Sequence, residues 1–370
     1  MNKDNEHHFT RGDFLNLSGL GIGAWTFFPR LKHLGDDFPD SERLGRICTE
    51  IRRGRVNLRK RPDYNSASAG ILYEDDVVVW LREVIGSRNS RPYRNNQRWV
   101  ETPEGYIWSA NVQPVSDERN EPVEKFLVRG ENPGMWVEVT VPYVEAILAN
   151  PPARHFWVQY RIQNQIPIRF YYKQILWVDE IKEDDDGIVW YRINERFGSE
   201  GDLFWSPAEA FRPIQEEEVS PIHPDVENKQ IVVNIHEKKQ YLSCFEGGTE
   251  VYFCRISSGR GKNSTPATQY GHPFWRKAIS YHMGGSTDDG IGWDTPGIGW
   301  TALFHGEGAA IHSTFWHNNF GERMSHGCVN VRPEDAKWIF RWSNPPVEYK
   351  EGKFDNDQRS NSTLVKVINE

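Results

Sequence analysis

The sequence predicts a mainly β protein built from several small modules, and three observations support that fold class. Most apolar residues fall in short runs separated by turn-forming residues, which is typical of small barrels and sandwiches. The 15 Trp, 14 Tyr and 19 Phe indicate that large aromatic side chains supply much of the buried surface. A chain of 370 residues is also long enough for two or three domains with separate cores.

The first 45 residues are predicted to be an export signal followed by a linker. Residues 10–25 combine a charged start with a short Gly-rich apolar segment, which resembles a twin-arginine signal in which Gly12 replaces the second arginine. A disordered tail is the alternative. No run reaches the roughly 20 apolar residues that a membrane-spanning helix requires.

Residues 46–116 form the first predicted module. Strands are expected at 55–62, 77–81, 98–101 and 105–108. The opening and closing runs, Val56-Asn57-Leu58-Arg59 and Gly105-Tyr106-Ile107-Trp108, resemble those of bacterial SH3-type barrels. Eight basic residues against one acidic residue between Arg43 and Arg61 indicate either a surface for anionic cell-wall polymers or lipid headgroups, or a solvated edge strand.

Residues 117–220 are predicted to form a second SH3-like β module. Aromatic runs at 156–160, 168–172, 175–178 and 188–192 indicate strands, and Asp185-Asp186-Gly187 indicates a hairpin turn. A short helix is expected from Pro142 to Ala149, ended by Pro151-Pro152. The acidic run 216–218 and the following prolines mark a linker.

The last domain is predicted to span 225–345 and to carry strands at 231–258, 309–314 and 328–331. A helix is expected from Pro333 to Trp342, because proline suits the first turn and acidic residues favour the positive end. Residues 259–305, rich in Gly, Trp and His, are predicted to be either a substrate lid or a structural crossover. Residues 346–370 are predicted to be a polar tail.

One cysteine and two histidines occur close together around a glycine in this domain. Ile311-His312-Ser313 is followed, after eleven residues, by Ser325-His326-Gly327-Cys328-Val329-Asn330. A thiol needs a base because its free pKa is about 8.5, and imidazole supplies one. Glycine permits a tight bend in which peptide N–H groups face a developing oxyanion. The pattern therefore indicates acyl transfer through a covalent cysteine intermediate.

Other uses of these residue types were weighed. Cys48, Cys244 and Cys254 are expected to be buried structural residues, and the turn at 246–249 does not place Cys244 opposite Cys254 for a disulfide. A zinc site is a second interpretation, although its spacing does not match that of structural zinc sites; its ligands would be His312, His317, His326 and Cys328. The net charge of −8 disfavours nucleic-acid binding.

The motif resembles the signature of the L,D-transpeptidase (YkuD-like) catalytic domain, which remodels bacterial peptidoglycan. Segments around Ile231, Gln240, Ile256 and Ser264-Thr265-Pro266 are similar to upstream parts of that domain. This sequence departs from the pattern at Ser313, at Thr268 and in the short interval before Ser325. The departures leave every reacting group in place. The resemblance implies a β-sandwich-type domain with a short C-terminal helix.

The resemblance also implies roles for individual residues. Cys328 would be the nucleophile and His312 its base, with the backbone carbonyl of Ser313 orienting the ring. His326 would shape the turn, and the N–H groups of Gly327 and Cys328 would bind the oxyanion. Substrate-binding roles are expected for residues within the motif or within residues 259–305: Asn330, Ser325 and Trp300. No metal or cofactor is implied.

The expected partners are peptidoglycan stem peptides, and the expected product is a 3→3 cross-link. Carbapenems are expected to acylate the same thiol. Three other functions remain open: an L,D-carboxypeptidase, a papain-like wall endopeptidase and a cell-wall-binding protein without activity. Papain-like enzymes place the cysteine before the histidine and at the start of a helix, which is the opposite order. A wall substrate predicts an exported protein, in the cell wall or at the extracytoplasmic face of a bacterial membrane.

Overall fold

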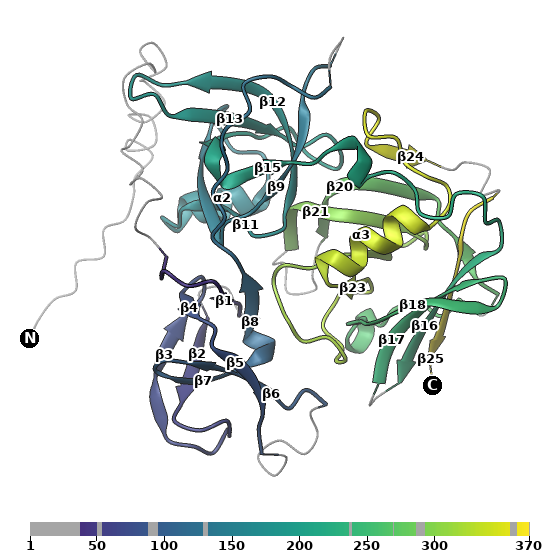
Figure 1. Ribbon diagram of the computed structural model, residues 1–370, viewed down its shortest axis with the longest axis horizontal. Coiled ribbons are helices and arrows are strands. Elements are labelled where there is room, and N and C mark those ends of the chain that lie inside the picture. Colours follow the sequence, from purple (N-terminus) through teal and green to yellow (C-terminus); the bar gives the residue numbers. More distant parts are fainter. Residues whose placement is uncertain are drawn as a thin grey trace, which may run out of the picture. The chain divides into compact units, whose positions relative to one another are not determined.

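Figure 1 shows the computed structural model, which describes residues 38–49, 54–87, 95–128, 132–236, 239–268, 270–285, 293–355 and 361–369. The predicted export signal lies outside these residues. Within the described ranges, no helix has both the length and the apolar character needed to cross a membrane. The chain is mainly β, as predicted, and its two α-helices in these ranges are α2 and α3.

The first module contains a three-stranded sheet, ordered β4-β1-β8, and a five-stranded sheet, ordered β3-β2-β7-β6-β5. Val56 and Leu58 of β2 alternate with exposed residues and pack with Val100 and Ile107, as expected for strands with one buried face. The predicted strands are confirmed, and the SH3-like assignment stays a prediction. The elements are β1 (Leu44–Ile47), β2 (Arg55–Arg59), β3 (Ser68–Tyr73), β4 (Val77–Val79), β5 (Arg82–Ile85), β6 (Arg98–Thr102), β7 (Gly105–Trp108), η3 (Ser109–Asn111) and β8 (Val112–Val115).

The middle module is built on a seven-stranded sheet ordered β11-β10-β14-β13-β12-β9-β15. The hairpin predicted at Asp185-Asp186-Gly187 is confirmed, because β12 and β13 pair antiparallel up to Glu183 and Val189 on either side of it. The elements are β9 (Met135–Val139), β10 (Tyr143–Leu148), α2 (Phe156–Gln163), β11 (Ile168–Tyr171), β12 (Ile175–Glu183), β13 (Val189–Asn194), β14 (Leu203–Pro207), η4 (Ala208–Ala210), β15 (Phe211–Pro213) and η5 (Glu216–Glu218).

Two predictions for this module were wrong, in opposite directions. The expected helix at 142–149 is strand β10, whose Val144 and Ala146 face inward while the strand pairs with β11 and β14. The expected strand at 156–160 is helix α2. Aromatic side chains favour strands, but the backbone N–H of Trp157 at the start of α2 donates to Asp294, which is distant in sequence. Tertiary contacts therefore overrode local propensity.

The C-terminal domain has two five-stranded sheets, ordered β18-β17-β16-β25-β19 and β23-β22-β21-β20-β24. Its core includes Ile231, Leu242, Ile311, Val329 and Phe340. The predicted helix α3 is confirmed, and it packs against β21 and β22 (Figure 1). The elements are β16 (Lys229–His236), β17 (Lys239–Glu246), β18 (Thr249–Arg255), η6 (Gly261–Asn263), β19 (His272–Pro273), β20 (Arg276–Gly285), β21 (Trp293–Leu303), β22 (Ala310–Ser313), β23 (Val329–Val331), α3 (Pro333–Trp342), β24 (Lys353–Asp355) and β25 (Leu364–Asn369).

The segment predicted to be a polar tail is part of this domain. Strand β25 pairs in parallel with β16 and antiparallel with β19, and β24 extends the other sheet beside β20. Val365 and Val367 of β25 are buried and the residues between and around them are more exposed, an alternation that is short and easily missed in a polar segment. Residues after 345 therefore complete both sheets.

Much of the described part of residues 259–305, predicted to be either a substrate lid or a structural crossover, is a strand pair. Strands β20 and β21 pair antiparallel from Arg276↔Leu303 to Gly285↔Trp293. Its glycines serve close packing as well as turns: a Cβ on Gly299 would lie 2.7 Å from Cδ1 of Ile175 in the middle module. The Gly-rich composition thus reflects close contact with a neighbouring side chain as well as loop structure.

Candidate active site

Two adjacent parallel strands bring the motif residues together. In the pairing of β22 with β23, Ile311 lies opposite Val329 and His312 lies opposite Asn330. Because side chains alternate between the faces of a sheet, His312 and Asn330 point to one face, and Cys328 precedes β23 with the same parity as Asn330. All three residues line one cleft.

His312 is buried and held as a neutral base. Its Nδ1–H donates to the carbonyl oxygen of Ser313 at 2.8 Å, which leaves Nε2 as the basic nitrogen. Burial lowers the pKa of His312 to about 4, partly offset by this hydrogen bond. The ring orientation predicted for the Ser313 carbonyl is therefore present, and the imidazole is uncharged at neutral pH.

Cys328 is a partly buried free thiol. Desolvation raises its pKa to about 11, with a backbone hydrogen bond from Ala310 acting in the other direction. Its Sγ lies 3.8 Å from the carbonyl oxygen of Gly308, and among the described residues it has no hydrogen bond to the His312 ring. The resting site is thus a neutral thiol beside a neutral imidazole.

The turn before Cys328 is closed by Ser325. Its hydroxyl donates to the carbonyl oxygen of Cys328 at 2.6 Å and accepts the N–H of Gly327 at 3.2 Å. Gly327 has a φ of 122°, in a region that side chains rarely adopt. His326 is exposed, and its ring is stacked on Trp293 with the centroids 6.0 Å apart. Ser325 thus shapes the turn and occupies one of the two N–H groups predicted for the oxyanion.

Asn330 is 1% exposed and its amide lies 2.9 Å from Nε2 of His317. The amide nitrogen, Nδ2, is the atom of Asn330 that faces this ring. The amide oxygen, Oδ1, is buried and has no hydrogen-bond partner among the described residues. Asn330 therefore has an amide oxygen left to accept a hydrogen bond from a ligand.

Trp300 is not at the site, contrary to the prediction. It is 2% exposed and its ring makes an edge contact with Phe340 of α3, with centroids 5.4 Å apart. Trp300 lies on the buried part of β21, whereas Trp293 at the start of the same strand lines the cleft. Composition could place a tryptophan near the site but could not select which one.

The cleft has a volume of about 660 Å³ and its walls come from all three modules. The first module contributes Arg46 and Asp75, and the middle module contributes Arg161 and Tyr171. Arg46 belongs to the basic run expected on a positive surface, but it is 3% exposed. The sequence indicated nothing of this shared construction, because the contributing segments are far apart in the chain.

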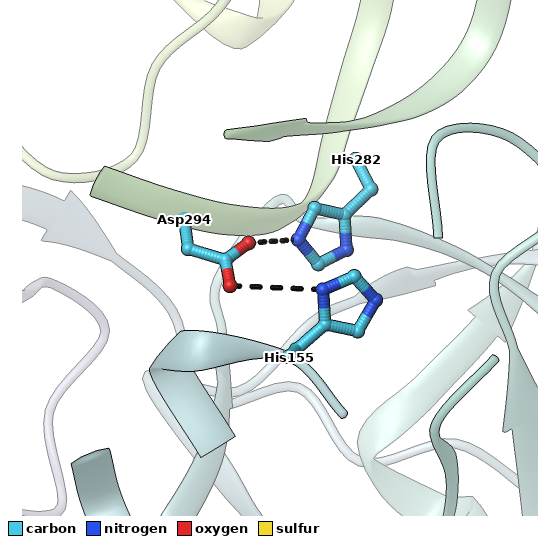
Figure 2. A group of neighbouring side chains, drawn as sticks. All are labelled: His155, His282 and Asp294. Carbon is cyan, nitrogen blue, oxygen red and sulfur yellow. Dashed lines mark hydrogen bonds and ion pairs between the residues drawn. The ribbon is translucent and has the colours of Figure 1, made fainter. Parts of the chain in front are cut away.

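A second cluster of titratable residues was missed by sequence reasoning (Figure 2). His155, His282 and Asp294 have side-chain nitrogen and oxygen atoms within 4.8 Å of one another. The two imidazole rings are stacked, with centroids 3.9 Å apart. Glu195 also reaches this cluster, 2.7 Å from Nδ1 of His282. Only folding joins these residues, since they come from different elements of two modules.

Hydrogen bonding identifies this cluster as a charge network rather than a set of metal ligands. Nε2 of His155 accepts the N–H of Glu200 at 2.7 Å, so Nδ1, which faces Asp294, carries the ring proton. A metal on Nδ1 would move that proton to Nε2, against the Glu200 donor. His282 contacts a carboxylate at each nitrogen, and although burial opposes its charge, Glu195 and Asp294 raise its pKa to about 10. His282 is therefore an imidazolium.

Known proteins resemble the C-terminal part of the chain. Residues 228–348 match the family model of the L,D-transpeptidase catalytic domain, YkuD. "Probable L,D-transpeptidase YbiS" of Escherichia coli (strain K12) is 31% identical over 133 residues, which are 32% of this chain and 43% of YbiS. The match thus spans less than half of that relative. The C-terminal part of the chain is thus similar to the YkuD-type L,D-transpeptidase catalytic domain, whereas the N-terminal modules are unassigned.

Solved structures of L,D-transpeptidases also match this chain, at lower sequence identity. The catalytic domain of the E. faecium L,D-transpeptidase is 24% identical, with a TM-score of 0.30, over 38% of this chain and 98% of that one. L,D-transpeptidase 3 from Mycobacterium tuberculosis, in complex with a faropenem-derived adduct, is 15% identical, with a TM-score of 0.29, over 68% of this chain and 97% of that one.

Proposed function

We propose that the protein is a peptidoglycan L,D-transpeptidase that forms a thioester between Cys328 and one stem peptide and transfers it to an amine of a second stem, giving a 3→3 cross-link. One observation carries the proposal: the parallel pairing of β22 with β23 places Cys328, His312 and Asn330 along one cleft. The family match of residues 228–348 supports the same chemistry.

The first half-reaction starts from two neutral groups. This step requires the Cys328 sulfur to leave the Gly308 carbonyl and to approach Nε2 of His312. As the sulfur attacks the substrate carbonyl, Nε2 takes the thiol proton, and it then gives that proton to the departing amine of the terminal D-amino acid. A base with a pKa of about 4 is fully available at neutral pH, and its imidazolium readily returns the proton.

The oxyanion needs donors that are free when the sulfur attacks. The N–H of Gly327 is bound to Ser325 Oγ at 3.2 Å, so we assign the first donor to the N–H of Cys328. The N–H of Gly327 becomes a second donor to the oxyanion when its hydrogen bond to Ser325 is broken. In other acyl-transfer enzymes the loss of a single oxyanion donor costs about 3–4 kcal/mol. The unpartnered Oδ1 of Asn330 is the acceptor we assign to an amide N–H of the stem.

The second half-reaction determines the product. An acceptor amine attacks the thioester, loses its proton to Nε2 of His312, and expels the Cys328 thiolate, which regains a proton. Water in place of the amine gives an L,D-carboxypeptidase. A stem substrate places the activity outside the cytoplasmic membrane, in agreement with the export predicted from the N-terminal sequence.

The test uses the full chain with a defined tetrapeptide stem and mass spectrometry. We expect a covalent adduct on Cys328 with loss of the terminal residue, and a cross-linked dimer when acceptor stem is added. Cys328→Ala should form no adduct, whereas Cys254→Ala, which removes a buried thiol elsewhere in the same domain, should keep it. An adduct on the Cys328→Ala variant, or hydrolysed product alone at high acceptor concentration, would overturn the assignment to a transpeptidase.

A further inference from the structure

The loop that follows the catalytic strand β22 carries two residues that contact the active site. The Trp316 ring lies 5.8 Å from the His312 ring, measured between centroids, and it packs in the same apolar cluster as Cys328. The amide of Asn330 lies 2.9 Å from the ring of His317 in this loop. A shift of residues 314–318 would therefore change the surroundings of the nucleophile, of its base and of Asn330, the residue proposed to bind an amide of the substrate.

Phe315, between these residues and the catalytic strand, is held by the other two modules. Its carbonyl oxygen accepts a hydrogen bond of 2.6 Å from Nη2 of Arg46, which is on β1 of the first module. Its ring is stacked on Tyr171 of the middle module, with centroids 5.8 Å apart and an interplanar angle of 19°. The loop is thus anchored from outside the catalytic domain.

Arg46 is itself held in one geometry. Nη1 donates to Asp75 at 2.8 Å, Nε donates to Gln113 at 3.1 Å, and the guanidinium lies 4.3 Å from the Tyr171 ring centroid. The planar guanidinium presents its donors in a fixed fork, which a lysine cannot reproduce. A buried charge is retained only when its hydrogen bonds are satisfied, and here one of them goes to the catalytic loop.

The opposite side of the cleft is also attached to the middle module. Asp294, next to Trp293, accepts the backbone N–H of Trp157 at 3.1 Å and lies 3.6 Å from Nδ1 of His155 (Figure 2). Trp293 stacks on His326, two residues before Cys328. The loop after β22 and the start of β21, which both lie against the catalytic turn, therefore depend on contacts with residues outside 228–348, the range that matches the family model.

We propose that Arg46 is a positioning residue for the catalytic centre, so that the N-terminal modules complete the active site of the C-terminal domain. The proposal rests on the function assigned to Cys328 and His312. Arg46 acts through the Phe315 carbonyl and does not touch the reacting atoms. A misplacement of about 1 Å at a reacting centre can cost roughly a hundredfold in rate, so loss of the anchor should be visible in acylation.

The test compares three variants of the full chain. Arg46→Gln removes the guanidinium, while Asp75 stays paired with Arg169 at 3.2 Å. Phe315→Leu removes the stacked ring without leaving a buried charge. The matched control, Arg82→Gln, removes an exposed arginine of the first module that pairs with Glu101. Each is measured for thermal unfolding, for the rate of Cys328 acylation by a tetrapeptide stem, and for the pH dependence of Cys328 alkylation by iodoacetamide.

A positioning role predicts a specific set of results. Arg46→Gln and Phe315→Leu should lower the acylation rate about ten- to a hundredfold with a smaller change in KM, and Arg82→Gln should match the unchanged protein. Because water would enter beside the displaced loop, the alkylation profile of both variants should move toward the ordinary thiol pKa. A role in folding alone would change the folded fraction but neither the profile nor the rate per folded molecule.

Two outcomes would overturn the proposal. One is an Arg46→Gln protein that is folded and acylates at the original rate with the original profile. The other outcome applies if Arg46→Gln does not fold. It is a folded Phe315→Leu protein that acylates at the original rate with the original pH profile. Failure of the proposed function is separate, because it shows as acylation that survives Cys328→Ala in the otherwise unchanged chain.

Discussion

Two buried histidines of this protein have opposite charge states, and the comparison shows what controls each. His312 in the active site is 3% exposed, and its pKa is lowered to about 4. His282, in the cluster between the middle module and strand β21, is also 3% exposed, but its pKa is raised to about 10. Burial lowers the pKa of both rings, so their hydrogen-bond partners account for the difference in pKa.

The partners are of different kinds. His312 has a neutral acceptor, the carbonyl of Ser313, and no carboxylate among its hydrogen-bond partners in the described residues. His282 lies between Glu195 and Asp294, and the negative charges override desolvation. The proposed base is kept neutral, whereas a residue that joins two modules is kept charged.

The largest expected effect is on catalysis by the neutral ring. His312→Gln should lower Cys328 acylation about a hundred- to ten-thousandfold, the range that general bases contribute, and leave the thermal midpoint nearly unchanged. His326→Gln is the control, since His326 is exposed and should affect the rate far less. The acylation rates are measured by mass spectrometry over time. Equal losses of rate in both variants would mean that His312 is not the base.

The next effect concerns the stability of the charged cluster. His282→Gln leaves Glu195 and Asp294 buried without their cation, and breaking such a pair costs about 3–5 kcal/mol in free energy of unfolding. Denaturant titration measures the loss, and Glu195→Gln combined with His282→Gln should recover part of it. A single variant within about 0.5 kcal/mol of the unchanged protein would mean that the cluster is solvated.

The pH dependence of stability follows from the raised pKa of His282. The pKa of His282 is about 10 in the folded protein and about 6.5 in the unfolded chain. The protonated ring therefore contributes its full stabilisation below about pH 6.5, and this contribution is lost as the pH rises to about 10. Asp294 acts in the opposite direction, because its lowered pKa stabilises the fold at neutral pH and this is lost only in strong acid. Thermal midpoints from pH 6 to 10 should therefore fall in the unchanged protein and stay flatter in His282→Gln.

Alkylation of the thiol tests the neutral half of the comparison. Because the pKa of Cys328 is about 11, its alkylation rate should rise about tenfold per pH unit between pH 7 and 10 and show no plateau in that range. A plateau below pH 8 would mean that the thiol and His312 form an ion pair at rest.

The smallest expected effect is at Trp300, the residue that sequence reasoning placed near the substrate. Trp300→Phe should reduce stability by about 1 kcal/mol and leave the acylation rate per folded molecule unchanged, because the ring lies in the core against α3. Trp293→Phe is the matched comparison in the cleft, and it should change the rate.

The proposed chemistry and the local elements that carry it could be predicted from the amino-acid sequence alone. His312, Cys328 and the flanking Ser313, Ser325 and Gly327 lie within a short stretch, so their spacing and side-chain types predicted a nucleophile, a base and a tight turn. Helix α3 was also predictable, because its proline, its acidic first turn and its apolar face are local signals.

The surroundings of these groups could not be predicted from the sequence and became clear only in the folded chain. The charge of His282, the burial of Arg46 and the start of α2 all depend on partners distant in the chain, such as Asp294 and Phe315. A sequence shows which groups can titrate or donate. Their pKa values and hydrogen bonds depend on distance and desolvation, which exist only once the modules have packed.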